Sequence, residues 1–189
     1  LEPALPRPAD VAPMWPVGAD EPFDAPDHLF EPTWGGHRVL AFVEPGVGAR
    51  PGTGEVRIVD AAGRDLAPVL PELGGLAVRL AAASAVLDGE LVVADPHGRP
   101  DAPGLAARLA GQPGRPVALL VYDLLHVDGR WLLSLPLVKR RRELRRILRP
   151  GDEVVAVPAI AGEGRALHAA VSAQGLAGIL ARDAASPYL

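Results

Sequence analysis

The stretch Glu31-Pro32-Thr33-Trp34-Gly35-Gly36-His37-Arg38 lies between two segments whose residues are typical of β-strands. Apolar residues lead into it from about residue 28 and continue after it to about residue 43. A tight two-residue turn needs positive φ angles, and Gly35-Gly36 can adopt them without a steric penalty. Taken alone, the stretch predicts a surface hairpin, with strands at 28–33 and 37–43 and a charged, solvated rim.

The composition indicates one folded domain, alone or with a small lobe. Hydrophobic residues make up 49% of the 189 residues, and the chain has no cysteine. Disulfides, thiolate metal sites and a cysteine nucleophile are therefore excluded. No apolar run approaches the roughly 20 residues that cross a bilayer, and the first residues lack the basic and apolar segments of a signal peptide. We therefore expect a cytoplasmic protein without a membrane partner.

The basic residues are almost all arginine, and of the 19 Lys and Arg residues only Lys139 is a lysine. Six arginines fall in segment 137–149, the clearest helix, whose leucines recur on its other face. Charge runs on amphipathic helices are usually solvated, so a solvated face is the favoured interpretation. The alternative is a salt-sensitive contact with DNA phosphates, for which the candidates are Arg141, Arg142 and Arg145.

The remaining pattern predicts strands and helices in irregular alternation. Residues 1–12 are expected to form a proline-rich extended arm and residues 13–189 the domain, with Met14 and Trp15 as the first core contacts. Strands outnumber helices and hairpins mix with helices, which favours an α+β fold with antiparallel sheets flanked by helices over a doubly wound α/β fold. The further strands expected are 55–59, 85–94, 116–127, 130–133, 154–157 and 177–182, and the helices are 71–82, 102–110, 137–149 and 163–174.

Three further blocks follow the opening stretch along the chain. They are Leu87-Asp88-Gly89-Glu90-Leu91-Val92, Leu120-Val121-Tyr122-Asp123-Leu124-Leu125 and Gly175-Leu176-Ala177-Gly178-Ile179-Leu180-Ala181-Arg182. Each block alone is weak, but the ordered set resembles the nucleotidyltransferase (adenylation) domain of ATP-dependent DNA ligases, particularly the bacterial end-joining type. The resemblance covers residues 13–189 and implies the fold that DNA ligases share with mRNA-capping enzymes. Family members continue into a lysine-rich fifth motif and an OB-fold domain, which this sequence does not contain.

The resemblance implies a reaction with ATP. In the family, a lysine amine attacks the α-phosphate of ATP, the AMP passes to a DNA 5′-phosphate, and the 3′-hydroxyl displaces it to seal the nick. Metal ions and cations stabilise the transferred group. Carried over position by position, the resemblance implies nucleotide contacts at five residues, of which Glu90 is also a weak candidate for Mg²⁺. These are Glu31 at the adenine, Arg38 near the ribose and phosphates, Glu90 at the ribose, Tyr122 stacked on the adenine, and Arg182 at a phosphate, where the family has a lysine.

Three positions depart from the family's motifs. Thr33 stands where the family has its nucleophilic lysine, Gly35 where it has an aspartate, and Ala177 where it has a glutamate that helps to hold the metal. A threonine hydroxyl is shorter than a lysine side chain and carries no positive charge. Lys139 falls in the arginine-rich helix and is not expected to replace the nucleophile. The resemblance therefore implies ATP or AMP, and more weakly Mg²⁺, as ligands, but no active catalytic residue.

Three hypotheses about function stay open. The first is a ligase-like domain that cannot form lysyl-AMP, retains non-covalent ATP or AMP binding and has an accessory role in DNA repair. The second is an active ligase or nucleotidyltransferase that uses another nucleophile or groups from another chain. The third is a pure protein- or nucleic-acid-binding module whose pocket is vestigial. The partner expected for the domain is DNA or a DNA-repair protein. Plainer roles also stay open for single residues: a charged strand end for Glu90, core packing for Tyr122, and surface charges for Arg38 and Arg182.

Overall fold

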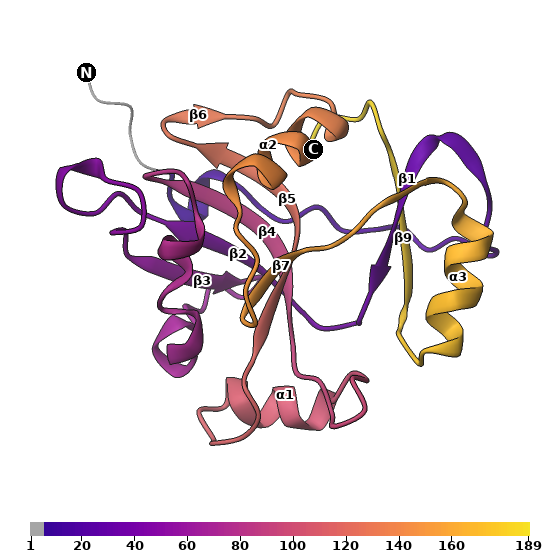
Figure 1. Cartoon of the computed structure of the whole chain (residues 1–189), viewed down its shortest axis with the longest axis horizontal. Coiled ribbons are helices and arrows are strands. Elements are labelled where there is room, and N and C mark those ends of the chain that lie inside the picture. The colour runs from indigo at the N-terminus through magenta and orange to yellow at the C-terminus, as the bar shows by residue number, and fades with distance from the viewer. Residues whose placement is uncertain (1–5) are drawn as a thin grey trace.

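The computed structural model describes residues 6–189, and its strands form two β-sheets that lie side by side (Figure 1). The larger sheet has six strands, in the order β3-β2-β4-β5-β6 with β7 beside β5, and the smaller has the order β8-β1-β9. Within the described chain, β7 runs parallel to β5 and the other pairs are antiparallel. The strands are β1 (Ala25–Thr33), β2 (His37–Val43), β3 (Val56–Asp60), β4 (Ala85–Val92), β5 (Ala118–Val127), β6 (Arg130–Trp131), β7 (Val154–Ala156), β8 (Ile160–Gly162) and β9 (Gly178–Asp183).

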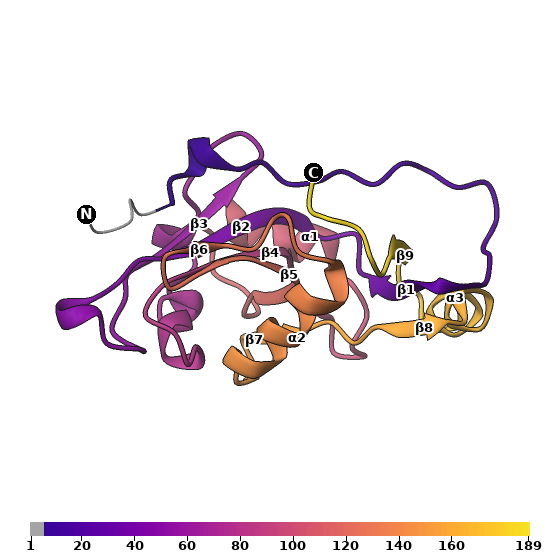
Figure 2. The same cartoon turned by 90° about the horizontal axis from the view of Figure 1, so that it is seen from above.

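The helices pack on both sheets, so the predicted α+β fold with antiparallel sheets is confirmed. Helix α3 packs on β1 and β9 of the smaller sheet, and helix α2 packs on β5 of the larger one (Figure 2). The α-helices are α1 (Ala102–Leu109), α2 (Leu137–Ile147) and α3 (Gly164–Ala173). None of the helices described between residues 6 and 189 is long and apolar enough to cross a membrane.

The predicted helix at 71–82 is wrong, because this region folds into short 3₁₀ turns. Proline and paired glycines interrupt the apolar periodicity there, and both disfavour a continuous α-helix. The 3₁₀ turns of the described chain are Pro8–Asp10, Val47–Ala49, Ala67–Val69, Pro71–Leu73 and Leu76–Arg79.

The predicted hairpin between β1 and β2 is also wrong, because the two strands belong to different sheets. Strand β1 pairs with β8 and β9, whereas β2 pairs with β3 and β4. The connection between them carries the chain from the smaller sheet to the larger one. Gly35 does have the positive φ angle, +66°, that the sequence predicts. A glycine pair fixes the local backbone, but it does not decide which strands form hydrogen bonds with each other.

The main apolar core lies against one face of the six-stranded sheet and includes Leu87 and Leu124, which are both 0% exposed. A smaller cluster on Leu40 and Phe42 includes Tyr188, and Met14 packs against it. Trp15 is 63% exposed, so its prediction as a core residue is wrong. Of the two predicted core contacts, only Met14 therefore packs against the core, and Val11 packs beside it.

Residues 11–24 contain no helix or strand and cross from the larger sheet to β1. The backbone N–H of Met14 donates a hydrogen bond of 2.9 Å to the hydroxyl of Tyr188. At the other end, a carboxylate oxygen of Asp24 accepts one of 3.0 Å from the N–H of Arg165. We call residues 14–23 the N-terminal strap. Of the predicted arm, residues 1–5 lie outside the described residues.

Candidate functional site

Glu90 holds the connection between the two sheets. Its carboxylate accepts hydrogen bonds from the backbone N–H groups of Trp34, at 2.8 Å, and Gly36, at 2.9 Å. It also accepts from the hydroxyls of Tyr122, at 2.6 Å, and Thr33, at 3.2 Å. The Glu90 side chain is buried, and these four donors occupy its oxygen atoms. In this structure the carboxylate therefore holds the backbone and side chains of the connection in place.

Gly35 and Ala177 lie against each other, although 142 positions separate them in the sequence numbering. A Cβ atom added to Gly35 would lie 2.9 Å from the Cβ atom of Ala177, closer than real side chains pack. Thr33 is close by, because it pairs with Gly178 in the β1–β9 ladder. The three positions that depart from the ligase motifs thus meet at one place. Two carboxylate side chains would not fit there with the backbone in this arrangement.

Arg38 is bound to the neighbouring strand β4. Its Nε and Nη2 atoms donate to the two carboxylate oxygens of Asp88 at 2.6 and 2.5 Å. The Tyr188 hydroxyl donates to the same carboxylate at 2.7 Å. Burial opposes the charge on Arg38, but the hydrogen bonds and charge of Asp88 outweigh it and raise the pKa of the guanidinium. The Trp15 ring lies beside Arg38, with its centroid 6.0 Å from Cζ.

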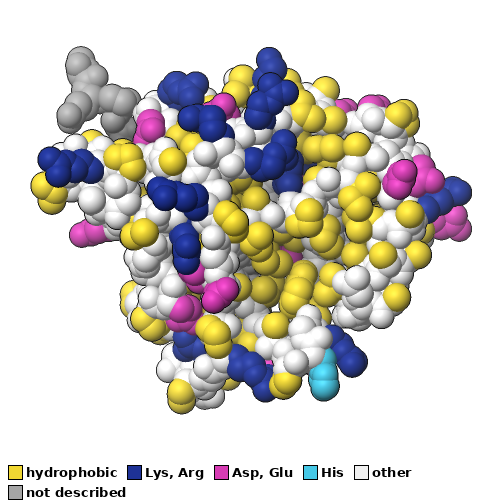
Figure 3. Space-filling model, in the orientation of Figure 1, with side chains coloured by type: hydrophobic (Ala, Val, Ile, Leu, Met, Phe, Trp, Pro, Cys, Tyr) yellow, Lys and Arg dark blue, Asp and Glu magenta, His cyan; other side chains and the backbone are white. Residues whose placement is uncertain are grey.

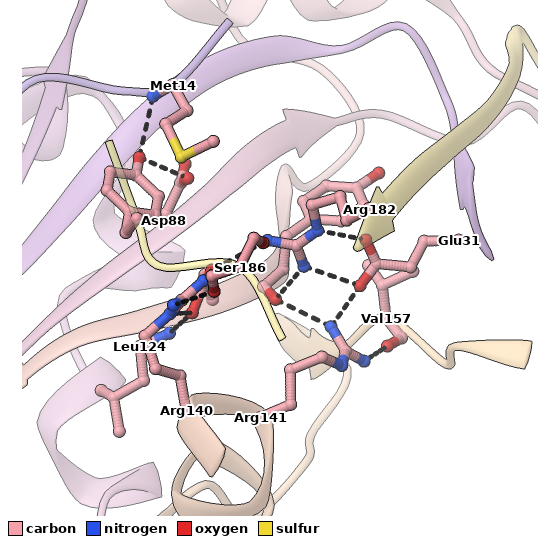
Figure 4. Close-up of polar contacts among 12 residues, drawn as sticks. Met14, Glu31, Asp88, Leu124, Arg140, Arg141, Val157, Arg182 and Ser186 are labelled. Carbon is pink, nitrogen blue, oxygen red and sulfur yellow. Dashed lines mark hydrogen bonds and ion pairs between the residues drawn. The ribbon is translucent and has the colours of Figure 1, made fainter. Parts of the chain in front are cut away.

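A buried group of charged side chains joins the two sheets, and we call it the interlayer cluster (Figure 4). It begins with Glu31 of β1, whose carboxylate accepts hydrogen bonds from Arg182 Nε at 2.9 Å and Nη2 at 2.8 Å. Arg141 of helix α2 also pairs with Glu31. Arg182 reaches Asp123 of β5 as well, at 2.8 Å. The cluster comprises Glu31, Asp123, Arg140, Arg141 and Arg182.

The arginine-rich face of α2 is only partly solvated. Arg140 is 1% exposed and donates from Nε and Nη2 to the two carboxylate oxygens of Asp123, each at 2.9 Å. Arg141 is 2% exposed, so its prediction as a DNA-phosphate contact is wrong. Its burial also lowers the pKa of this guanidinium, against the charge of Glu31. Arg142 and Arg145 are exposed, and Figure 3 shows dark blue side chains around this helix.

A cavity of about 860 Å³ lies between the N-terminal strap, strand β9 and the larger sheet. Among the residues that the sequence assigned to nucleotide contacts, Arg38, Tyr122 and Arg182 line it, whereas Glu31 and Glu90 do not. Burial, followed by the charge of Glu90, raises the pKa of Tyr122, so its hydroxyl stays a hydrogen-bond donor. The structure thus brings three of the five predicted residues to one cavity and gives the other two structural partners.

Sequence reasoning missed several polar residues of the site, namely Asp88, Asp123, Arg140 and Tyr188. Asp88 could have been found, because it lies two residues before Glu90 on a strand and therefore on the same face. No local sequence pattern predicts the pairing of Arg182 with Glu31, because the two residues are 151 positions apart. Long-range charge pairs of this kind become visible only when the fold is known.

The residues present do not form a metal site. Among residues 6–189, no group of three or more His, Cys, Asp or Glu side chains could hold a metal ion. The carboxylate of Glu90, the predicted candidate, is taken up by its four donors. Gly35 and Ala177, the positions of acidic residues in the ligase motifs, supply no oxygen from a side chain. The arrangement thus does not fit a protein-held Mg²⁺ ion.

Known proteins match most of this chain. Residues 24–189 match the family described as "ATP dependent DNA ligase domain". The chain is 33% identical over 180 residues to the multifunctional non-homologous end joining DNA repair protein LigD of Mycobacterium tuberculosis, covering 95% of this chain and 22% of that protein. It is 36% identical over 138 residues to a probable DNA ligase of Kineococcus radiotolerans, covering 70% of this chain and 27% of that protein.

Solved structures show the same relationship. A mycobacterial DNA ligase D complexed with ATP and MES matches with a TM-score of 0.77 and 29% identity, covering 97% of this chain and 57% of that one. The ligase domain of M. tuberculosis LigD matches with a TM-score of 0.70 and 29% identity, covering 88% and 52%. This chain thus spans only part of the length of its relatives. It belongs to the ATP-dependent DNA ligase family and corresponds to an adenylation domain of the bacterial end-joining type.

Proposed function

We propose that this adenylation domain does not form lysyl-AMP, binds a purine nucleotide non-covalently and has an accessory role in bacterial DNA end joining. The observation that supports it best is the contact between Gly35 and Ala177, where an added Cβ would lie only 2.9 Å from its neighbour. With the backbone in this arrangement, a side chain at position 35 would collide with the one at position 177. Replacing the lysine by Thr33 alone would not create this contact between positions 35 and 177. The contact therefore supports a loss of the site's acidic groups as well as of its nucleophile.

The chemistry at Thr33 supports the same proposal. A nucleophile must carry a reactive lone pair toward the α-phosphate, with a base or a lowered pKa to activate it. The Thr33 hydroxyl donates to Glu90 at 3.2 Å and accepts from the N–H of Gly35, also at 3.2 Å. Glu90 also accepts hydrogen bonds from the N–H groups of Trp34 and Gly36 and from the hydroxyl of Tyr122, so its carboxylate is shared among four donors. The only lysine, Lys139, is exposed on helix α2.

The cavity is suited to a bound purine. Its volume of about 860 Å³ lies within the range of small-molecule sites, roughly 300–1,000 Å³. The Tyr122 side chain lines one wall, and aromatic faces stack on flat heterocycles. ATP would supply a phosphoanhydride to an active ligase, whereas in this domain it is proposed only as a ligand. No step here depends on a metal, since the side chains do not fit one.

Intact-mass spectrometry after incubation with ATP and either Mg²⁺ or Mn²⁺ tests the loss of self-adenylation. We expect no covalent AMP adduct, with an active ATP-dependent ligase as the positive control. The variant Thr33→Lys should stay unmodified as well, because Gly35 and Ala177 still lack their carboxylates. An adduct on the natural sequence would overturn the proposal, and peptide mapping would identify the nucleophile.

Calorimetric titration with AMP and ATP tests the non-covalent binding. A purine site predicts a saturable heat with either ligand. A cavity that has lost its ligand would give none, and the domain would then be a pure binding module. We also propose that residues 13–189 form the functional domain, and that its partner is DNA or a DNA-repair protein. Arg142 and Arg145 on α2 support DNA as the partner, because both are exposed and arginines can neutralise phosphates.

A further inference from the structure

The three arginines that line the cavity already form ion pairs with carboxylates of the protein. Arg182 makes four hydrogen bonds, to Glu31, Asp123 and the carbonyl of Tyr122. Arg140 makes four as well, two of them to Asp123. Arg38 forms a two-point pair with Asp88. A phosphate group would have to displace a buried carboxylate from one of these arginines, and breaking a buried ion pair is costly.

Acidic side chains also line the cavity. Asp88 and Asp183 lie on its walls, and Asp20 and Glu21 lie in the N-terminal strap. Asp88 is paired with Arg38, and the other two lining arginines are paired with Asp123 and Glu31. Within residues 6–189, the lining carboxylates of Asp20, Glu21 and Asp183 are left without an ion pair. A triphosphate would therefore place several negative charges near fixed negative charges. Juxtaposed like charges oppose binding strongly.

Much of the remaining wall is apolar and aromatic, and it also includes His168 and Ser186. Phe23 and Phe30 meet edge to face, with ring centroids 5.4 Å apart, and both line the cavity. Trp15 and Ile179 line it as well, and Trp15 exposes most of its surface. Such side chains gain from covering a flat, uncharged heterocycle. The wall therefore favours the base of a nucleotide and disfavours its phosphates.

From these observations we infer that the cavity selects an uncharged purine nucleoside over its phosphorylated forms. The inference rests on the proposed purine binding and reverses the preference expected of an ATP-dependent ligase. The affinity falls with each added phosphate, in the order adenosine, AMP, ATP. The positions of the paired arginines, rather than a loss of the cavity, determine this order.

Isothermal titration of the full chain with adenosine, AMP and ATP tests the ranking, in EDTA and at about 0.15 M salt, where exposed charges are screened over about 8 Å. We expect adenosine to bind at least about tenfold more tightly than ATP, because like charges face its phosphates. Equal or tighter binding of ATP would overturn the inference, as would a failure of all three to bind. Neither result depends on the mass-spectrometric test, which alone decides whether lysyl-AMP formation is lost.

A pair of tryptophan variants locates the ligand. Trp15→Ala removes an aromatic face from the cavity and should weaken adenosine binding about fivefold, within the usual range for aromatic contacts. Trp131→Ala is the matched control, because Trp131 is also partly exposed, at 40%, but lies on β6 outside the cavity. Equal effects of the two variants would place the nucleoside elsewhere and overturn the inference.

A charge variant separates electrostatics from shape. The double variant Asp20→Asn with Glu21→Gln should strengthen ATP binding about twofold and leave adenosine binding unchanged, since both groups are exposed and partly screened. Glu55→Gln is the control, because Glu55 is an exposed acid directly before the edge strand β3 and does not line the cavity. If the double variant raises the affinity for adenosine as much as for ATP, charge does not set the ranking and the inference fails.

Discussion

The apolar core against the six-stranded sheet and the interlayer cluster between the sheets both contain fully buried side chains but differ in chemistry. Leu87 and Leu124 of the core are 0% exposed, and so are Glu31 and Asp123 of the cluster. Helix α2 belongs to both, because Leu144 faces the core while its arginines enter the cluster. One side of the molecule is thus held by aliphatic packing, and the junction of its sheets by paired charges.

The difference concerns what each region contributes. Aliphatic burial stabilises in proportion to area and tolerates swaps of similar volume. A buried ion pair gains little net free energy over a well-packed apolar pair, but removing one partner leaves a charge without compensation. The cluster therefore fixes how the smaller sheet sits on the larger one, whereas the core supplies most of the stability. Substitutions in the two regions should differ accordingly.

The largest effect is expected for Glu31→Ala. The change leaves Arg141 without a carboxylate partner and Arg182 with Asp123 alone, and it should lower the free energy of unfolding by about 3–5 kcal/mol. Urea denaturation measures the loss, with the exposed Glu55→Ala as control. A cost smaller than that of a leucine truncation in the core would contradict the role assigned to the cluster.

Leu87→Ala should lower the stability by about 2–5 kcal/mol, through reduced burial and the cavity left behind. The informative comparison is with Leu87→Met, which keeps the volume and should cost below about 1.5 kcal/mol. Glu31→Gln, the corresponding conservative change in the cluster, should not be tolerated in this way, since it removes the charge that two arginines need. Similar losses of stability for Leu87→Met and Glu31→Gln would show that the core and the cluster do not differ in their tolerance of conservative changes.

Tyr122→Phe should lower the stability by about 1.5–3 kcal/mol, as is usual for a hydrogen bond to a charged group. The variant removes the hydroxyl that donates to Glu90 at 2.6 Å and lies 3.0 Å from the carbonyl of Pro32. Thr33→Val removes a longer hydrogen bond to the same carboxylate, 3.2 Å, and should cost less. The reverse order in thermal unfolding would mean that Thr33, not Tyr122, holds Glu90.

The acid side of the stability curve should depend on Asp60 at the end of β3. Burial opposes its charge, but hydrogen bonds from Arg64 and His37 lower its pKa from 3.8 to about 2. A lowered pKa stabilises the fold above pH 3.8, and this contribution is lost as the pH falls through about 2. The loss should reach roughly 2 kcal/mol. Asp60→Asn should flatten this limb of a pH series, and an unchanged slope would exclude Asp60.

The elements that form the apolar core could be predicted from the sequence, whereas the interlayer cluster could not. Apolar runs and periodicity located β4, β5 and α2 from sequence, because aliphatic burial follows the period of each element. The sequence did not predict that Arg140 and Arg141 are buried, since their partners lie on other strands. The prediction of a hairpin at Gly35-Gly36 was wrong for a related reason, because the partners of each strand are set by the whole fold and not by the local turn.

The candidate site was predictable as a set of motifs but not as a geometry. The ordered blocks identified the family, and Arg38, Tyr122 and Arg182 do meet at one cavity. Glu31 and Glu90 were expected to face the nucleotide, yet each is surrounded by donors from the protein. A motif gives the identity of a residue, while its partners decide whether the residue is free to bind a ligand.

The smallest effect on stability is expected on the solvated face of α2, where Arg142→Gln and Arg145→Gln should leave the melting temperature unchanged. If these side chains bind DNA, the double variant should weaken binding to nicked duplex. The slope of log K against log salt should fall by about 0.9 for each phosphate that an arginine no longer neutralises. Arg50→Gln, an exposed arginine in the loop after β2, is the matched control. An unchanged slope would exclude this face from DNA binding, and the exposed arginines of α2 would then serve solvation alone, unlike the two that enter the cluster.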